Sequence, residues 1–334
     1  MLLAYAGRSR TKSDYMISTL DLARICGVSQ GTVDRALHNR TGIGKATRER
    51  ILAAARKHGY QPHPAARELL TGERRLVGAI IPVINSVFFM DLMNAIHAAI
   101  VPAGYSLFLA QANNRAEFLA ALRDFAARRS RAVLLIPPED AIPIPREVLS
   151  SGTDLFSLVN PSVTKAVQFI GPDEFRTGRD AVAYLAGKGH TRILHITYSR
   201  KAYAIEARAQ GYCQAMHARG LKPMLLRPLD AVALQRALDQ YQPTALFCHN
   251  DWLALSVMRL LEIRGIKVPD DISVLGVDNS PTFVALCPGI TTLAYPTTEM
   301  AAAIRKQLIT RQPASSVPVC EVMERATVDA LPQI

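Results

Sequence analysis

The sequence of 334 residues predicts a small all-α head followed by a two-lobed α/β body with parallel sheets. Three observations predict this arrangement. Residues 18–60 contain three short segments with helical spacing and recognisable start or stop signals. From Leu76 onward, apolar runs of strand length alternate with helical segments, which is typical of parallel sheets. Residues 1–75 carry 14 Lys and Arg against 6 Asp and Glu, a net of +8, whereas the rest carries 25 against 22, a net of +3.

The first predicted helix is the segment STLDLARIC. Ser18 and Asp21 are spaced as a capping box, with Asp where Glu or Gln is usual. Gly27 is expected to end the helix. The side expected to be buried consists of Leu22, Ala23, Ile25 and Cys26.

The second predicted helix is VSQGTVDRAL. Ser29 stands where an N-cap residue is expected, and Val33 and Leu37 share one side. The opposite side is polar and consists of Gln30, Gly31, Asp34 and Arg35. A helix, a tight turn with glycine and a second helix form the helix-turn-helix pattern.

The third predicted helix, ATRERILAAARKHGY, completes a small core. Its inward residues are Ile51, Leu52, Ala55 and Tyr60, and Gly59 stops it. A basic head on a nearly neutral body suggests a polyanionic partner for the head. Charge alone fits DNA, RNA or a membrane surface.

Composition excludes several classes of protein. No run of about 18 uncharged apolar residues is present, so no membrane span is expected. The N-terminus places apolar residues before basic ones, the reverse of a signal peptide. The five cysteines follow no metal-ligand or disulfide pattern, which favours the cytoplasm. Nucleotide-binding glycine motifs, the G-x-S-x-G motif and zinc-ligand spacings are absent, so we expect no enzyme, no cofactor and no metal.

The head carries a specific resemblance. Its "A-x-x-x-G-V-S-x-x-T-V-x-R-x-L" core, the "T-R-E-R-I" of the third helix, the following "G-Y-x-P" and the later "A-A-R-x-L" resemble the DNA-binding head of the lactose-repressor (LacI) family. The resemblance implies that the second helix lies in the major groove of operator DNA. The DNA-binding residues that it implies in this unit are Ser29, Gln30, Gly31, Thr32, Arg35 and Lys45.

These positions have different expected roles. Gln30, Gly31 and Arg35 fall on base-reading positions, because Arg donates two hydrogen bonds to guanine and Gln pairs with adenine. Thr32 falls on a phosphate-contacting position. Gly31 has no side chain, so one of the three base-reading positions cannot contact a base through a side chain. Lys45 follows Gly44 at the start of the third helix, either as a phosphate contact or as an ordinary surface lysine.

Asp34 departs from the family pattern, in which Ser is usual. Its carboxylate is expected either to accept from a cytosine amino group or to repel phosphate and disfavour wrong registers.

The segment HPAARELLTGERR follows the head. It begins near Pro64 with good helix formers, but it is too short to hold a helix alone. The resemblance implies a hinge that becomes helical on DNA and inserts Leu69 into a minor-groove base step. The alternative is that Leu69 and Leu70 pack on the body.

The body resembles the family's effector-binding core, which is similar to periplasmic sugar-binding proteins. The matching stretches are NSVFF, GPDEFRTGRDAVAYLAGKGHTRI, RAQGY, HNDWLALSVMRLLEIRGIKVPDDISVLGVDNSP and ITTLAYP. The resemblance implies an effector cleft at the strand ends, where open α/β sheets bind ligands. The effector-binding residues that it implies are Ser86, Phe88, Phe89, Asn160, Arg208, Asn250, Asp251 and Asp278.

Several of these residues have alternative interpretations. Phe88 and Phe89 also fit a core, and Asp278 also fits a turn cap. Asp251 is equally well placed to be the N-cap of the next helix. Trp252, the single tryptophan, fits packing better than stacking on a ligand.

The predicted organisation is an extension over 1–15, a helix-turn-helix domain over 16–62, a hinge over 63–75 and an effector-binding and dimerisation core over 76–334. In that core, lobe 1 comprises about 76–172 and 296–313, and lobe 2 about 173–295 and 314–334.

The predicted function is a cytoplasmic, homodimeric, sequence-specific transcriptional regulator, expected to be a repressor. Its partners are double-stranded operator DNA and a small-molecule effector, expected to be a carbohydrate, with no membrane partner. The alternative is a solute-binding or sensor protein without operator specificity.

Overall fold

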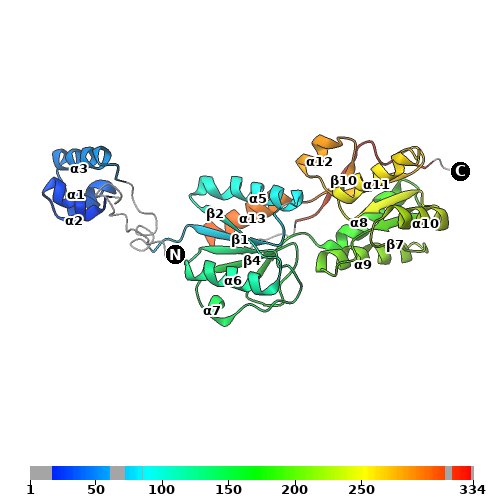
Figure 1. Ribbon diagram of the computed structural model, residues 1–334, viewed down its shortest axis with the longest axis horizontal. Helices are drawn as coiled ribbons and strands as arrows, with labels where there is room; N and C mark the ends of the chain where they lie inside the picture. The colour runs from blue at the N-terminus through cyan, green and yellow to red at the C-terminus, as the bar shows by residue number, and fades with distance from the viewer. Residues whose placement is uncertain (1–16, 61–71, 85, 313–317, 332–334) are drawn as a thin grey trace, which may run out of the picture. The chain divides into compact units, whose positions relative to one another are not determined.

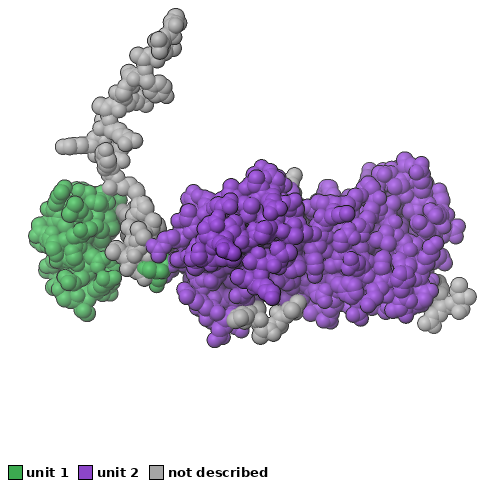
Figure 2. Space-filling model, turned by 90° about the horizontal axis from the view of Figure 1, so that it is seen from below, with its two compact units in different colours: residues 1–73 green, residues 74–334 purple. Residues whose placement is uncertain are grey.

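The computed structural model describes residues 17–60, 72–84, 86–312 and 318–331 (Figure 1). The chain divides into two compact units, residues 1–73 and 74–334 (Figure 2). The predicted extension over 1–15 and most of the predicted hinge, including Leu69, lie outside the described residues. None of the described helices combines the length and the apolar character that crossing a membrane requires.

Within residues 17–60, the head contains three helices, α1 (Thr19–Cys26), α2 (Gln30–Leu37) and α3 (Lys45–Lys57). Ser18 and Asp21 form the predicted capping box, and Gly27 turns the chain at the end of α1 with φ of 62°. The buried core of the head consists of Leu22, Ala23, Cys26, Val33, Ala36, Ile51 and Ala55. The prediction that Ile25 is buried was wrong: its side chain is 48% exposed, because it lies off the face that Leu22 and Cys26 share.

The first sheet of the body is entirely parallel, in the order β2-β1-β3-β4-β5. Its strands are β1 (Leu76–Ile81), β2 (Ser106–Gln111), β3 (Ala132–Leu135), β4 (Asp154–Leu158) and β5 (Gln168–Ile170). The accompanying helices are α5 (Val87–Ile100), the 3-10 helix η1 (Val101–Ala103), α6 (Arg115–Ala127) and α7 (Arg146–Leu149). Helices α5 and α6 contribute to different hydrophobic clusters, so they cover opposite faces of this sheet (Figure 1).

The second sheet has the order β11-β10-β9-β8-β6-β7, and only β11 runs antiparallel to its neighbour. Its strands are β6 (Ile193–Ile196), β7 (Met224–Leu226), β8 (Ala245–Cys248), β9 (Ser273–Asp278), β10 (Thr291–Ala294) and β11 (Glu321–Met323). Its helices are α8 (Glu174–Gly187), α9 (Tyr203–His217), α10 (Ala231–Tyr241), α11 (Asp251–Ile263) and α12 (Pro281–Leu286). Helices α8 and α9 pack on one face, and α10 and α11 on the other.

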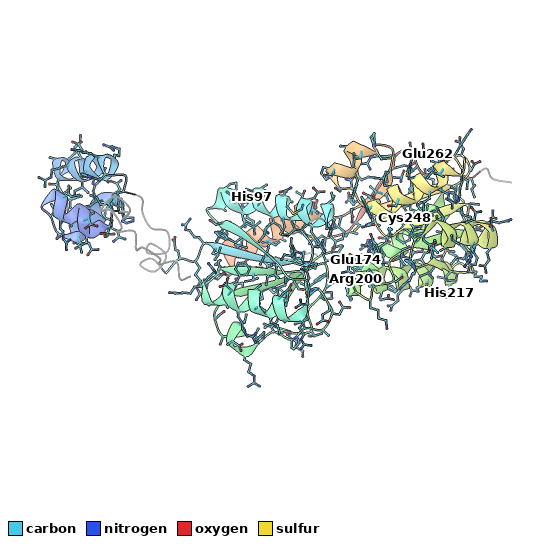
Figure 3. The ribbon with its side chains drawn as sticks, in the orientation of Figure 1. His97, Glu174, Arg200, His217, Cys248 and Glu262 are labelled. Carbon is cyan, nitrogen blue, oxygen red and sulfur yellow. The ribbon has the colours of Figure 1, made fainter. Side chains whose placement is uncertain are left out.

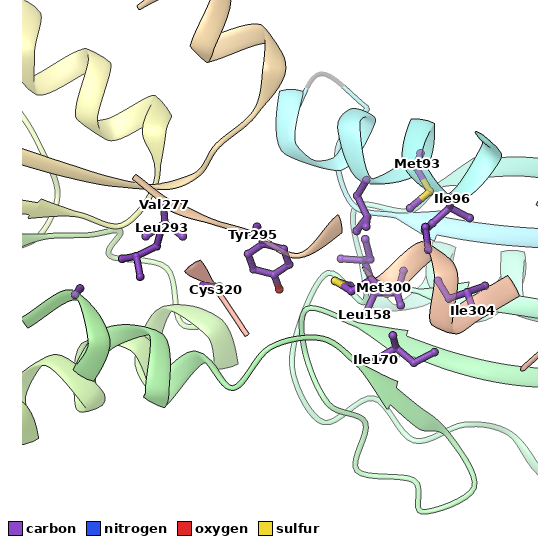
Figure 4. Packing of buried hydrophobic residues seen from close by; sticks show 14 of the residues in the cluster. Met93, Ile96, Leu158, Ile170, Val277, Leu293, Tyr295, Met300, Ile304 and Cys320 are labelled. Atoms are coloured by element: carbon purple, nitrogen blue, oxygen red, sulfur yellow. The ribbon is translucent and has the colours of Figure 1, made fainter. Parts of the chain in front are cut away.

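The chain passes between the sheets three times. It leaves the first sheet after β5, returns after β10 to form α13 (Thr297–Thr310) against α5, and rejoins the second sheet as β11. Tyr295 lies at the second of these crossings, within a buried cluster that includes Leu293 and Met300 (Figure 4). We call the first sheet with its helices and α13 lobe 1, and the second sheet with its helices lobe 2.

Candidate functional site

The polar side of α2 faces away from the core of the head. Val33 and Ala36 are buried on the opposite side of the helix. The three residues predicted to read bases are all exposed: Gln30, Gly31 and Arg35. An exposed polar face on the second helix of a helix-turn-helix unit is what a major-groove reader needs.

Polar side chains order the start of α2. Ser29 Oγ accepts a hydrogen bond from the backbone N–H of Thr32 at 3.2 Å, which confirms Ser29 as the N-cap, and the two hydroxyl oxygens lie 2.9 Å apart. Gln30 Nε2 donates to Thr19 Oγ1 at 2.9 Å, so α1 orients the Gln30 amide.

The carboxylate of Asp34 pairs with two other side chains of the head. Arg40 Nη1 donates to its Oδ2 at 3.0 Å, and His38 Nδ1 lies 3.0 Å from its Oδ1. Both roles considered from the sequence assumed a free carboxylate. The structure instead pairs Asp34 with Arg40, and this pairing partly neutralises the negative charge on the α2 face.

Arg35 and Lys45 are exposed, and neither side chain has a hydrogen-bond or ion-pair partner among the described residues. Lys45 is the first residue of α3, and Gly44 caps that helix without a side-chain hydrogen bond. A cation at a helix N-terminus is unfavourable, and a nearby anion relieves it. A phosphate contact of Lys45 stays a prediction.

The body contains a cavity of about 460 Å³ at the carboxyl ends of strands from both sheets. Pro82, Ile136 and Val159 line it just after strands of lobe 1, and Tyr198 and His249 just after strands of lobe 2. Open α/β sheets bind ligands at such an edge. Seven of the eight residues predicted to bind effector line this cavity: Ser86, Phe88, Phe89, Asn160, Arg208, Asn250 and Asp278.

The eighth predicted residue, Asp251, is not among the residues that line the cavity. Its carboxylate is 1% exposed and accepts hydrogen bonds from Thr292 Oγ1 at 2.7 Å and from the backbone N–H of Asn279 at 2.8 Å. The N-cap of α11 is Asn250, whose Oδ1 accepts from the backbone N–H of Leu253. Asp251 therefore holds the β9–β10 region together.

Arg208 forms an ion pair with Glu174, a residue that was not predicted from the sequence to lie at the site. Its Nε and Nη2 donate to Glu174 Oε2 at 2.9 and 2.5 Å, and its Nη1 donates to the carbonyl of His249. Glu174 is completely buried and Arg208 is 3% exposed. Removing one partner of such a pair leaves a buried charge uncompensated, which costs about 3–5 kcal/mol. Arg208 is therefore structural as well as cavity-lining.

Close helix packing brings this pair together. A Cβ on Gly178 of α8 would lie 2.1 Å from the carbonyl oxygen of Arg208, and a Cβ on Gly211 of α9 would lie 1.9 Å from that of Phe175. Neither position has room for a methyl group. The two glycines let α8 and α9 approach closely enough for Glu174 to reach Arg208.

Asp278 occupies a strained turn at the end of β9. Its φ is 125°, and Asn279 follows with φ of 55°, both in the region that favours glycine. Burial, with Asp251 as a neighbouring charge, raises the pKa of Asp278 well above its usual range. No hydrogen bond to its carboxyl is found among the described residues, and the carboxyl lines the cavity, where water or a ligand can bind it.

Three further buried polar atoms around the cavity have no hydrogen-bond partner in the described part of the chain. They are Glu174 Oε1, His249 Nδ1 and the hydroxyl of Tyr295. Buried polar atoms without partners are rare in proteins, and one explanation is a ligand that completes them.

Aromatic rings supply the apolar part of the wall. The ring of Phe88 contacts that of Tyr295 edge-on, with centroids 4.8 Å apart, and that of Phe89 at 5.4 Å. A second cavity of about 410 Å³ shares Phe88, Asp278 and Tyr295 with the first. Five further cavity residues were not predicted from the sequence: Glu174, Tyr198, Arg200, His249 and Tyr295. Tyr198 and Arg200 follow β6 and His249 follows β8, so their position after strands is the signal that could have found them.

Comparison with known proteins gives matches in both units. Residues 19–63 match bacterial regulatory proteins of the lacI family, and residues 182–328 match a periplasmic binding protein-like domain. The HTH-type transcriptional repressor CytR of Escherichia coli K12 is 28% identical, with 96% of this chain and 99% of CytR covered.

Solved structures share the fold. The Lac repressor dimer bound to operator and the anti-inducer ONPF matches with a TM-score of 0.81 and 21% identity, over 95% of this chain and 100% of that one. The CelR–cellobiose complex matches with a TM-score of 0.64 and 23% identity, over 93% and 99%. The chain therefore belongs to the lacI family of bacterial regulatory proteins, with a helix-turn-helix head and a periplasmic-binding-protein-like body.

Proposed function

We propose that this chain is a transcriptional repressor that binds operator DNA through α2 and whose DNA affinity is set by a carbohydrate effector. The proposal that α2 binds DNA rests on its polar face. On this face the Arg35 side chain is exposed and unpartnered, while Val33 and Ala36 on the opposite side are buried in the core of the head. Because DNA is the target, we place the protein in the cytoplasm.

The effector is proposed to occupy the cavity of about 460 Å³. Hydroxyl groups can donate to Glu174 Oε1 and the Asp278 carboxyl, and can also accept from the Tyr295 hydroxyl. The faces of Phe88 and Phe89 suit the C–H side of a sugar ring. The structural relative CelR, which was solved with cellobiose, supports a carbohydrate.

We further propose that two copies of the chain act together, because paired heads read the two halves of a palindromic operator. An apolar patch on α11 and α12 supports this proposal. Trp252 is 55% exposed and Leu286 is 68% exposed, and the ring of Trp252 lies 6.1 Å from that of Phe283. As the sequence suggested, Trp252 packs against a neighbouring ring and does not line the cavity, although more than half of it is exposed. Phe283 is buried against the ring of Trp252, and we call the exposed residues Trp252 and Leu286 the α11–α12 patch.

The experiment is a selection of duplexes from a random pool, followed by titration of the full chain with the selected duplex and a shuffled control. We expect the selected duplex to bind at least about 10³-fold more tightly at the same salt concentration. A carbohydrate panel is then added, and at least one member should change operator affinity and raise the melting temperature.

One outcome would favour the alternative of a sensor without operator specificity. In that case both duplexes would bind equally, with only the steep salt dependence of phosphate contacts.

A further inference from the structure

Charge in the effector cavity is unbalanced at one residue. The charged side chains that line the cavity are Glu174, Arg200, Arg208 and Asp278. Glu174 and Arg208 neutralise each other through their ion pair at 2.5 Å. Arg200 has no hydrogen bond or ion pair among the residues that the structure describes.

Asp278 does not balance Arg200. The two residues form no ion pair in the described chain, and the raised pKa of Asp278, caused first by burial, favours its uncharged form. Burial also lowers the pKa of His249 well below its ordinary value, so that this ring is neutral. The cavity therefore carries one uncompensated positive charge, on Arg200.

Arg200 stands on the loop between β6 and α9. It is exposed, whereas the neighbouring cavity residues Ala202 and Ala204 are buried. Arg200 lines the cavity together with Tyr198 and His249, which follow strands of the same lobe. Arg200 and Glu174, both labelled in Figure 3, line the same cavity.

We infer that the effector is a carbohydrate that carries an anionic group, a phosphate or a carboxylate, and that Arg200 binds this group. The inference rests on the proposed function and narrows its ligand class. The hydroxyl-bearing part of the ligand lies against Phe88, Glu174 and Asp278, and the anion lies at the rim. The planar guanidinium donates two parallel hydrogen bonds to a phosphate or carboxylate, and the charge on the acceptor makes them stronger than hydrogen bonds to the hydroxyls of a neutral sugar.

The test is calorimetric titration of the full chain with matched sets of ligands. One set is glucose, glucose 6-phosphate and gluconate, and the other is ribose, ribose 5-phosphate and ribonate. We expect one anionic member to bind at least tenfold more tightly than its neutral sugar, a difference of 1.4 kcal/mol. Comparing the sugar phosphates with gluconate and ribonate shows whether the anionic group is a phosphate or a carboxylate.

Two variants locate the contact. Arg200→Gln should reduce the ratio of anionic to neutral affinity to about parity. The control is Lys201→Gln, because Lys201 is the adjacent exposed cation and does not line the cavity. It should keep the full preference. Melting temperatures without ligand verify that both variants are folded.

The outcomes separate the two proposals. If neutral sugars bind as tightly as the anionic forms, or if Arg200→Gln keeps the preference, the inference is overturned and the carbohydrate effector stands. If neither neutral nor anionic sugars bind, the proposed effector class fails together with the inference. If inorganic phosphate alone binds as tightly as the sugar phosphates, the anion is recognised without a sugar and the carbohydrate part is overturned.

Discussion

Arg35 is the only cationic side chain on α2, and it projects from the exposed face. If it reads a guanine, Arg35→Ala should cost about 1–3 kcal/mol on the selected operator and flatten the preference at one base pair. Lys45→Ala is the control, because a phosphate contact contributes equally to every sequence and its loss should weaken all duplexes alike. Binding curves on single-base variants of the operator measure both effects. Unchanged base preference in Arg35→Ala would refute the assignment.

His195 makes the body sensitive to acid. It is completely buried, its Nδ1 pairs with the carbonyl of Phe247 at 2.9 Å, and burial lowers its pKa to about 3. In the unfolded chain the His195 ring takes up a proton near pH 6.5, whereas in the folded chain it does so only near pH 3. The contribution of His195 to the free energy of unfolding is therefore complete above pH 6.5 and is lost as the pH falls toward 3. The slope attributable to this one group is about 1.4 kcal/mol per pH unit.

The measurement is the free energy of unfolding of the body by denaturant at pH 7 and pH 5. The parent should lose about 2 kcal/mol more than His195→Gln over this interval. The control is His217→Gln, since His217 is exposed on α9 (Figure 3), and it should follow the parent. Comparing differences between variants removes the contributions of His190 and His249, whose pKa values are also lowered by burial. Parallel pH profiles for the parent and His195→Gln would contradict the prediction.

At the scale of elements, the crossing of α8 and α9 has the least tolerance for change. Gly211→Ala would place a methyl group against the Phe175 carbonyl, which forces the helices apart and strains the Glu174–Arg208 pair. We expect a loss of about 3 kcal/mol in stability, and weaker effector binding. Gly187→Ala is the matched control on α8, because no atom lies within 4 Å of its Cβ position. It should be neutral or slightly stabilising in thermal unfolding.

The elements that sequence could predict are those with local signals. Ser18, Ser29 and Gly27 mark helix ends within three or four residues, so the head was predicted with its caps. Strand β7 has three residues, too few for an alternation to be recognised, and β7 and α10 were not predicted. Asn250 and Asp251 are adjacent and both can cap a helix, so only the structure could assign the cap to Asn250.

For the cavity too, the sequence predicted what local patterns encode and not what depends on contacts between distant residues. Strand ends predicted its location, because parallel strands bring their carboxyl ends to one edge. The partnership of Glu174 with Arg208 joins residues 34 positions apart through a helix crossing, and no local pattern encodes it. Membership of the lacI family confirms the prediction of a transcriptional regulator rather than an enzyme.

At the scale of the whole molecule, the α11–α12 patch is the surface on which we expect two copies to meet. Leu286→Glu should raise the dimer dissociation constant at least tenfold, because it places a carboxylate in an apolar contact. Val232→Glu is the control, since Val232 is 60% exposed but lies on α10. Sedimentation velocity over a dilution series compares them. Equal dissociation of both variants would place the contact elsewhere.

The position of Trp252 gives this protein a built-in optical reporter. It is the only tryptophan in the sequence, so all indole fluorescence comes from the first turn of α11. That turn begins at Asn250, which lines the effector cavity, while Trp252 lies on the outer patch. Pairing of two copies should shift the emission to shorter wavelength as water leaves the indole. A ligand that moves Asn250 should change the emission of the same fluorophore, so one unlabelled sample can report assembly and cavity occupancy in separate titrations.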